Sequence, residues 1–180
     1  ATPIQLDVTT APSEPSLDFD GSNDVVIISD NAIMQPPGNF TIEAWIYPTD
    51  GSAHQRIVAK GDGASAGDDS GSIFWDTYDG STGLGLRIGI ANSSDMYTST
   101  PASGAILTLN TWQHVAMVFD QGVFTTYLNG VAQTSADLLE TTLFDNAVDW
   151  SIGEDAAGFN EVFNGQIDEV RFWHSARTPE

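Results

Sequence analysis

From Leu17 onward, short apolar runs alternate with clusters of Gly, Asp, Asn and Ser. Runs of this length, with alternating polarity and many β-branched residues, are typical of β-strands. Only residues 136–140 hint at a helical turn. About ten to twelve strands without a long helix predict an all-β sandwich of two sheets. The predicted strands are residues 25–28, 40–47, 56–60, 72–78, 84–91, 114–119, 123–128, 131–134, 150–152 and 166–173.

Two short polar segments predict tight hairpins between neighbouring strands. Asn129-Gly130 separates two strand-like runs, and Asn and Gly both tolerate the positive φ that a type I′ turn requires. Residues 120–122, Asp-Gln-Gly, predict a second hairpin just upstream. Nothing repeats at a fixed period, which excludes a solenoid or a propeller.

Alternation along residues 40–47 divides this strand into two faces. One face is purely apolar and the other mixes polar and aromatic residues, Glu43 and Trp45 among them. Such an amphipathic face is suited to contact a ligand, or to pack under a loop. The two alternatives cannot be separated from the pattern alone.

The first 16 residues differ in texture from the rest, with three prolines among Thr, Ser and Ala. This composition predicts a linker, although the alternation of Ile4, Leu6 and Val8 would also suit an edge strand. Residues 17–176 are then the folded domain, and residues 177–180 begin the next linker. We expect covalently linked neighbouring domains in a longer chain. No signal-peptide pattern and no run of transmembrane length is present in this sequence.

Charge narrows the classes of partner. The chain has 25 acidic and 5 basic residues, for a net charge of −20. This field repels nucleic acid and anionic membrane surfaces, so neither is expected as a partner. Asp dominates among the acids, and its short carboxylate suits both turns and calcium sites. The excess fits a calcium-rich extracellular setting, and the absence of cysteine excludes disulfides and thiolate chemistry.

The last predicted strand carries a sign of irregularity. Ile167 and Val170 are both apolar but stand an odd number of residues apart, so a regular strand would point them to opposite faces. A β-bulge at Asp168-Glu169 resolves the conflict, and bulges re-aim side chains. Asp168 is therefore a candidate to face a cation.

Several segments, in their order and spacing, resemble the laminin G-like branch of the concanavalin A-like lectin/glucanase superfamily. The resemblance implies a jelly-roll of two curved antiparallel sheets. It further implies a carbohydrate- or protein-binding module of a secreted or cell-surface protein, such as a bacterial adhesin. The segments that carry it are residues 17–26 (LDFDGSNDVV), 40–48 (FTIEAWIYP), 57–61 (IVAKG), 112–116 (WQHVA), 127–130 (YLNG) and 165–173 (GQIDEVRFW).

The same resemblance implies a structural calcium ion. Its expected ligands are Asp20, Asp24 and Asp168, with backbone oxygens around Gly21. The alternative is that Asp168 caps a turn or pairs with a nearby arginine. A second cation or ligand site could draw on the acidic loops, although a solvated loop residue is the commoner role for any one of these acids. Its candidates are Asp62, Asp68, Asp69 and Asp155.

Aromatic residues beside acids are the candidates for sugar contact. Trp75 and Tyr78 flank Asp76 after the acidic loop, and Glu43 and Trp45 are the second pair. Packing in the core is the alternative for each aromatic ring. Glucanases of the resembled fold place two carboxylates on one strand, and no predicted strand here offers that pair, so the chain is not expected to be an enzyme.

These observations favour a non-catalytic, calcium-binding recognition module that binds a glycan or another cell-surface ligand outside the cell. The alternative is a structural or protein-interaction module that uses calcium only for stability.

Overall fold

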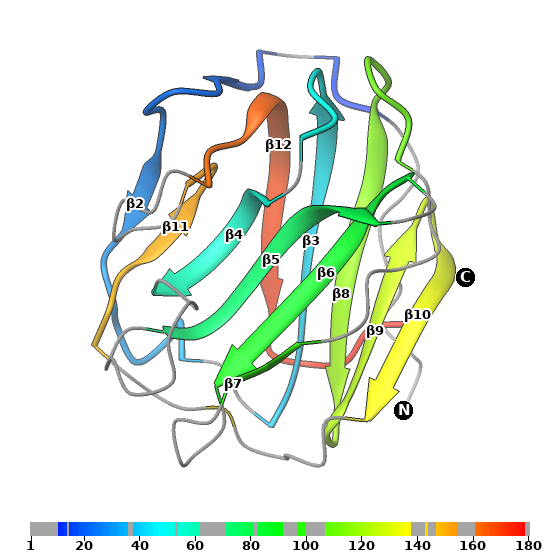
Figure 1. Ribbon diagram of the computed structural model, residues 1–180. Coiled ribbons are helices and arrows are strands. Elements are labelled where there is room, and N and C mark those ends of the chain that lie inside the picture. Colours follow the sequence, from blue (N-terminus) through cyan, green and yellow to red (C-terminus); the bar gives the residue numbers. More distant parts are fainter. Residues whose placement is uncertain are drawn as a thin grey trace.

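The computed structural model describes residues 11–13, 15–35, 38–52, 54–61, 71–80, 83–91, 97–99, 107–137, 143, 147–154 and 161–178. In this part of the chain, β-strands form two antiparallel sheets of six strands each (Figure 1). Strands β4, β5 and β6 of one sheet cross in front of β12, β3 and β8 of the other. The predicted all-β jelly-roll sandwich is therefore confirmed.

Strand order places residues that are distant in sequence side by side. The first sheet has the order β1–β12–β3–β8–β9–β10, and the second has the order β2–β11–β4–β5–β6–β7. The strands are β1 (Leu17–Asp20), β2 (Val26–Ile28), β3 (Asn39–Pro48), β4 (Gln55–Gly61), β5 (Gly71–Gly80), β6 (Gly83–Ala91), β7 (Tyr97–Ser99), β8 (Gln113–Asp120), β9 (Val123–Leu128), β10 (Val131–Asp137), β11 (Trp150–Ile152) and β12 (Asn164–Trp173).

Each predicted strand coincides with an observed one, and β9 and β11 begin and end where the pattern indicated. Strands β1 and β7 were not predicted, because four and three residues are too short for alternation to stand out. Ala136 and Asp137 continue β10 instead of forming the helical turn that the pattern hinted at.

Both predicted hairpins are present. Gln121 and Gly122 have φ of 49° and 98°, and Asn129 and Gly130 have φ of 48° and 77°. Asp120 pairs with Val123 across the first turn. Two successive positive φ angles give a turn the twist that matches its flanking strands, so both loops connect their strands directly.

The predicted bulge in β12 is also present. The register of β12 against β3 shifts between Asp168 and Arg171, and Glu169 has φ of 51°. The Asp168 carboxylate accepts a hydrogen bond of 2.7 Å from the backbone N–H of Glu169. The shift lets Ile167 and Val170 both pack on the core despite their odd spacing.

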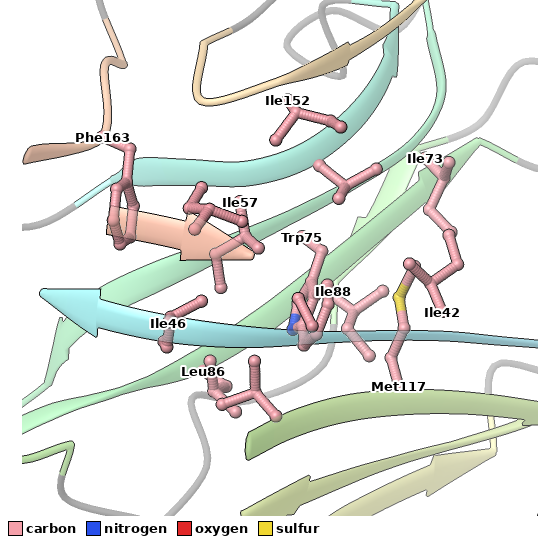
Figure 2. Packing of buried hydrophobic residues seen from close by; sticks show 14 of the residues in the cluster. Ile42, Ile46, Ile57, Ile73, Trp75, Leu86, Ile88, Met117, Ile152 and Phe163 are labelled. Carbon is pink, nitrogen blue, oxygen red and sulfur yellow. The ribbon is translucent and has the colours of Figure 1, made fainter. Parts of the chain in front are cut away.

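The core lies between the two sheets and is built from the inward faces of both (Figure 2). Ile42, Ile46 and Met117 come from the first sheet, and Trp75 and Ile88 come from the second. All five are at most 1% exposed. Because strands alternate, the neighbours of these residues point to the outer faces, and those faces carry the polar clusters described next.

Candidate ligand-binding site

Trp75 and Tyr78 do not form the aromatic pair predicted from their proximity in sequence. Trp75 is fully buried in the core between the sheets, so the prediction that it contacts a ligand is wrong (Figure 2). Tyr78 is half-buried. The two residues stand three apart on β5, and a strand with a period of two points such residues to opposite faces. Tyr78 therefore lies on the outer face with Phe74 and Asp76.

Asp76 is the centre of a charged cluster on this outer face. In the antiparallel register it lies opposite Arg56 of β4 on one side and Arg87 of β6 on the other. Its Oδ2 accepts hydrogen bonds of 2.6 Å from Arg56 Nη1 and 2.5 Å from Arg87 Nη2. Its Oδ1 accepts a bond of 3.2 Å from Arg87 Nε. The Asp76 side chain is completely buried beneath the two guanidinium groups.

Aromatic rings hold the two guanidinium groups in place. The Phe74 ring is buried, with Arg56 Cζ 4.1 Å and Arg87 Cζ 4.8 Å from its centre. The Tyr78 ring centre lies 4.8 Å from Arg87 Cζ. The face of an aromatic ring attracts a cation placed above it, so these contacts stabilise both guanidinium groups in their positions. Arg87 is thus fixed by Asp76 and by two rings while 17% of its side chain remains exposed.

His54 completes the accessible part of the cluster. Its Nδ1 lies 2.8 Å from Arg87 Nη2, and a guanidinium can only donate, so Nδ1 accepts and the ring proton lies on Nε2. The ring stands edge-on to Tyr78 with centroids 5.3 Å apart. His54 adopts the left-handed φ of 62°, which is uncommon for a residue other than glycine. Its side chain is 41% exposed.

The charges of this arginine cluster (Arg56, Arg87, Asp76, Glu161 and His54) balance. Glu161 forms an ion pair with Arg56. Two arginines therefore face two carboxylates, with His54 beside them, in a chain whose net charge is −20. The accessible edge of the cluster presents N–H donors and an aromatic ring in a place where the acidic excess of the chain is locally cancelled.

The sequence-based prediction missed Arg56, Arg87 and His54. One signal was present. The chain has five Lys and Arg residues, and four of them, Arg56 and Arg87 included, stand in predicted strands. Arg87 lies on the face opposite the apolar row of its strand. What the pattern could not indicate was that Arg56 and Arg87 lie on either side of the same aspartate, because strand register is a tertiary property.

Glu43 and Trp45 lie on the outer face of the other sheet, and the prediction that they face a ligand is wrong. The Glu43 side chain is 1% exposed and Trp45 is 9% exposed. Glu43 Oε1 accepts bonds of 2.9 Å from Trp173 Nε1 and 3.1 Å from Arg177 Nη1. Trp45 packs edge-on against His114. The alternative of packing beneath another segment, left open by the sequence, is the one that occurs.

Burial alone would raise the pKa of Glu43, but its partners outweigh that effect. Contacts with His114, whose Nε2 lies 3.6 Å from Oε2, and with Trp173, together with the charge of Arg177, lower the pKa of Glu43 below its ordinary value of 4.5. The carboxylate therefore stays ionised in a buried position and anchors the C-terminal segment.

The sequence predicted that residues 177–180 begin a linker. Arg177 instead packs on the domain. It is 8% exposed, its backbone N–H donates to Thr41 Oγ1, and its guanidinium lies 4.0 Å above the Trp173 ring. Residues 176–178 and strands β8 and β9 enclose a groove of about 360 Å³ on this face, with Tyr127 in its wall. This groove is the second place where a ligand could be accommodated.

The carboxylates predicted to share a calcium ion do not come together. Asp20 pairs with Asn164 at one end of β1, and Leu17 pairs with Ile167 at the other end. Asp168 follows Ile167, so about 13 Å of strand separates it from the Asp20 turn at about 3.3 Å per residue. The prediction that Asp168 completes a site with Asp20, Gly21 and Asp24 is wrong.

Asp20 and Asp24 instead serve their own turn. The backbone N–H of Asp20 donates to Asp24 Oδ2 over 2.9 Å, and Ser22 N–H donates to Asp20 Oδ1 over 2.8 Å. In the described ranges, no group of three or more His, Cys, Asp and Glu residues could hold a metal ion. The predicted loop ligands Asp62, Asp68, Asp69 and Asp155 lie outside the described residues.

Comparison with known families agrees with this architecture. The sequence pattern of the laminin G-like family described as the concanavalin A-like lectin/glucanases superfamily matches residues 20–180. The chain belongs to this superfamily. The expected membership, inferred from ordered motifs, is thereby confirmed. No curated protein is similar enough to the chain to count as a match.

Several solved structures share this fold with the chain at low sequence identity. Domain 4 of the extracellular GH43 arabinanase AbnA from Geobacillus stearothermophilus, in complex with arabinotriose, has 18% identity and a TM-score of 0.66, with 90% of this chain and 71% of that chain covered. A putative carbohydrate binding protein from Bacteroides ovatus has 24% identity and a TM-score of 0.66, covering 90% and 45%. The CBM40 of Ruminococcus gnavus IT-sialidase bound to α2,3 sialyllactose has 14% identity and a TM-score of 0.70, covering 91% of both chains.

These likenesses establish the fold of the superfamily for this chain. Its 180 residues span less than half of the Bacteroides chain, so the fold is found within larger proteins. No helix in the described ranges is both long and apolar enough to cross a membrane.

Proposed function

We propose that this chain is a non-catalytic carbohydrate-binding module whose ligand contacts the accessible edge of the arginine cluster on β4, β5 and β6. The observation that carries the proposal is the convergence of Arg87, His54 and Tyr78 on one outer sheet face. The fold likeness to saccharide-bound domains supports it.

The chemistry of the three side chains suits a sugar. A saccharide ring presents hydroxyl groups that need donors and acceptors and an apolar face that can rest against an aromatic ring. Arg87 supplies fixed N–H donors, His54 supplies the Nε2 proton, and Tyr78 supplies a half-buried ring. Because Asp76 and the strands hold these groups in place, little conformational entropy is lost when a ligand binds.

The carboxylates of the cluster favour binding over hydrolysis. Retaining glycoside hydrolysis needs two carboxyl groups about 5–5.5 Å apart, one of which is protonated. Asp76 is instead buried under two guanidinium groups, which occupy its oxygens and block its access to a sugar. Glu161 is paired with Arg56. We propose recognition without catalysis, in an extracellular or cell-surface protein with further domains.

Truncating the aromatic ring tests the location of the ligand. We expect Tyr78→Ala to abolish binding on a glycan array without unfolding the protein, since the residue is only half-buried. Tyr127→Ala is the matched control, because Tyr127 is also half-buried but lines the groove on the opposite sheet. Loss of binding in Tyr127→Ala with retention in Tyr78→Ala would place the ligand in that groove. An array on which the wild type binds no glycan would favour the alternative, a structural or protein-interaction module.

We also propose that calcium stabilises the domain, as the excess of Asp and the net charge of −20 favour cation binding. A ligand present at about 100 times its dissociation constant adds about 2.7 kcal/mol to the stability of the native state. We therefore expect the melting temperature in millimolar calcium to exceed that in chelator by roughly 5–11 °C.

Two variants separate the possible ligands of that ion. Because Asp168 lies away from the Asp20 turn, Asp168→Asn should leave the calcium-dependent rise in melting temperature intact. Asp20→Asn tests whether the turn at Asp20 binds the ion. An equal melting temperature of the wild type with calcium and with chelator would refute the proposal.

A further inference from the structure

We infer that the arginine cluster selects saccharides that carry a carboxylate, with Arg87 as the residue that contacts it. This inference rests on the proposed function and adds a ligand class to it. A uronic acid or a nonulosonic acid presents such a group beside the ring hydroxyls. The argument depends on which N–H donors of Arg87 are already used and on how the surrounding charges are shared.

Arg87 has N–H donors to spare among the described residues. A guanidinium carries five N–H bonds, one on Nε and two on each terminal nitrogen. Nε bonds Asp76 Oδ1, and Nη2 bonds Asp76 Oδ2 and His54 Nδ1. None of the described residues accepts a hydrogen bond from Nη1. Among the described residues, two N–H groups of Arg87 therefore have no acceptor. The side chain is partly exposed and cannot swing away, because Asp76 and two aromatic rings hold it.

The charge of Arg87 is only partly neutralised by Asp76. That single carboxylate is shared with Arg56, which bonds the same Oδ2 atom. Arg56 is 2% exposed and out of reach of a ligand, and its second partner is Glu161. On the accessible edge, the Glu161 carboxylate lies nearest to His54, with Glu161 Oε1 3.9 Å from His54 Nδ1, and it forms no ion pair with Arg87 among the described contacts. Arg87 is thus the cation of the cluster that a ligand can reach.

The remaining basic residues offer no comparable site. Lys60 is completely buried against Asp30, and Arg177 is nearly buried against Glu43. Arg171 is 32% exposed but pairs with Glu169 and lies near Glu43. An anionic sugar approaching this acidic chain is repelled over most of its surface, so short charge-assisted hydrogen bonds at Arg87 must outweigh that repulsion. A group with one negative charge meets less repulsion than a doubly charged one, which favours a carboxylate over a phosphate.

Matched sugar pairs test the inference. The affinity of the wild type would be measured for methyl β-glucuronide against methyl β-glucoside and for α2,3-sialyllactose against lactose, within the same array used above. We expect the acidic member of at least one pair to bind about tenfold more tightly, as charge-assisted hydrogen bonds are about twice as strong as neutral ones. Arg87→Gln should remove this preference, because the affinity for the acidic member should fall about tenfold further than the affinity for the neutral member.

Controls keep each outcome decisive. Arg171→Gln changes an arginine on the other sheet and should leave the preference unchanged. If Arg87→Gln does not fold, Arg87→Lys keeps the charge beside Asp76 but lacks the spare Nη1 donors, and it should reduce the preference. Equal affinity for both members of each pair, a preference that survives in the folded Arg87 variant, or a preference for sulfated over carboxylated glycans would overturn the inference and leave the proposed function standing. An array on which no glycan binds would overturn both.

Discussion

Replacing Asp76 by alanine is expected to lower the free energy of unfolding by about 3–5 kcal/mol, which is the usual cost of removing one partner from a buried ion pair. Asp76 is completely buried and accepts hydrogen bonds from two arginines. Without it, Arg56 remains 2% exposed with Glu161 as its carboxylate partner, and Arg87 loses the group that orients it. At about 2–4 °C per kcal/mol, the melting temperature should fall by roughly 6–20 °C.

Urea denaturation of wild type and variant measures this cost. Asp120→Ala is the control, because Asp120 is an exposed residue at the end of β8 in the same charge-rich chain. Its substitution should change stability by less than about 0.5 kcal/mol. If Asp76→Ala lowers the free energy of unfolding as little as the control does, the two arginines do not need Asp76 to stay in place. Asp76 would then not be the group that holds Arg87 rigidly for a ligand.

Replacing Glu43 by glutamine is expected to lower the free energy of unfolding at neutral pH by about 1.5–3 kcal/mol, the range of hydrogen bonds made to a charged group. The carboxylate is buried between Trp173, Arg177 and His114. Glutamine has nearly the same shape but no charge. Arg177 then stays nearly buried without its carboxylate, and the contact that holds residues 175–178 on the sheet weakens.

The dependence on pH follows from the direction of the Glu43 pKa. The pKa in the folded protein lies below the ordinary value of 4.5, so the folded state binds the proton less tightly than the unfolded chain. The stabilisation is fully present above about pH 4.5 and is lost as the pH falls through the folded pKa. The difference between wild type and Glu43→Gln should therefore shrink from pH 7 towards pH 3. A difference that stays constant over this range would contradict the assignment of the carboxylate as ionised.

These two predictions concern the two outer sheet faces, which differ in what they can do. On the first sheet, the C-terminal residues cover Glu43 and take up the charge of the buried carboxylate. On the second sheet, Arg87, His54 and Tyr78 remain partly accessible. The second face is therefore the better candidate for recognition, and the Tyr78 and Tyr127 variants compare the two directly.

The sequence by itself determined ten of the twelve strands, the two tight hairpins and the bulge at Asp168-Glu169. Each depends on neighbours along the chain. Alternation locates a strand, Asn-Gly supplies two positive φ angles, and an odd spacing of apolar residues requires an extra residue in the strand. Together with the order of the motifs, these local features were sufficient to identify the superfamily, which the match over residues 20–180 confirms.

Only the tertiary structure decided which faces are covered and which side chains meet. Alternation shows that Glu43 and Ile42 point in opposite directions, but not that Trp173 and Arg177 will cover Glu43. The pairing of β1 with β12 separates Asp168 from Asp20, and the register of β4, β5 and β6 brings Arg56 and Arg87 to Asp76. Strand order and register arise from contacts between distant segments, and shifting a register by one residue reverses every side chain. The candidate site consists of such contacts, so the local pattern could indicate Tyr78 as a candidate but could not assemble the cluster around it.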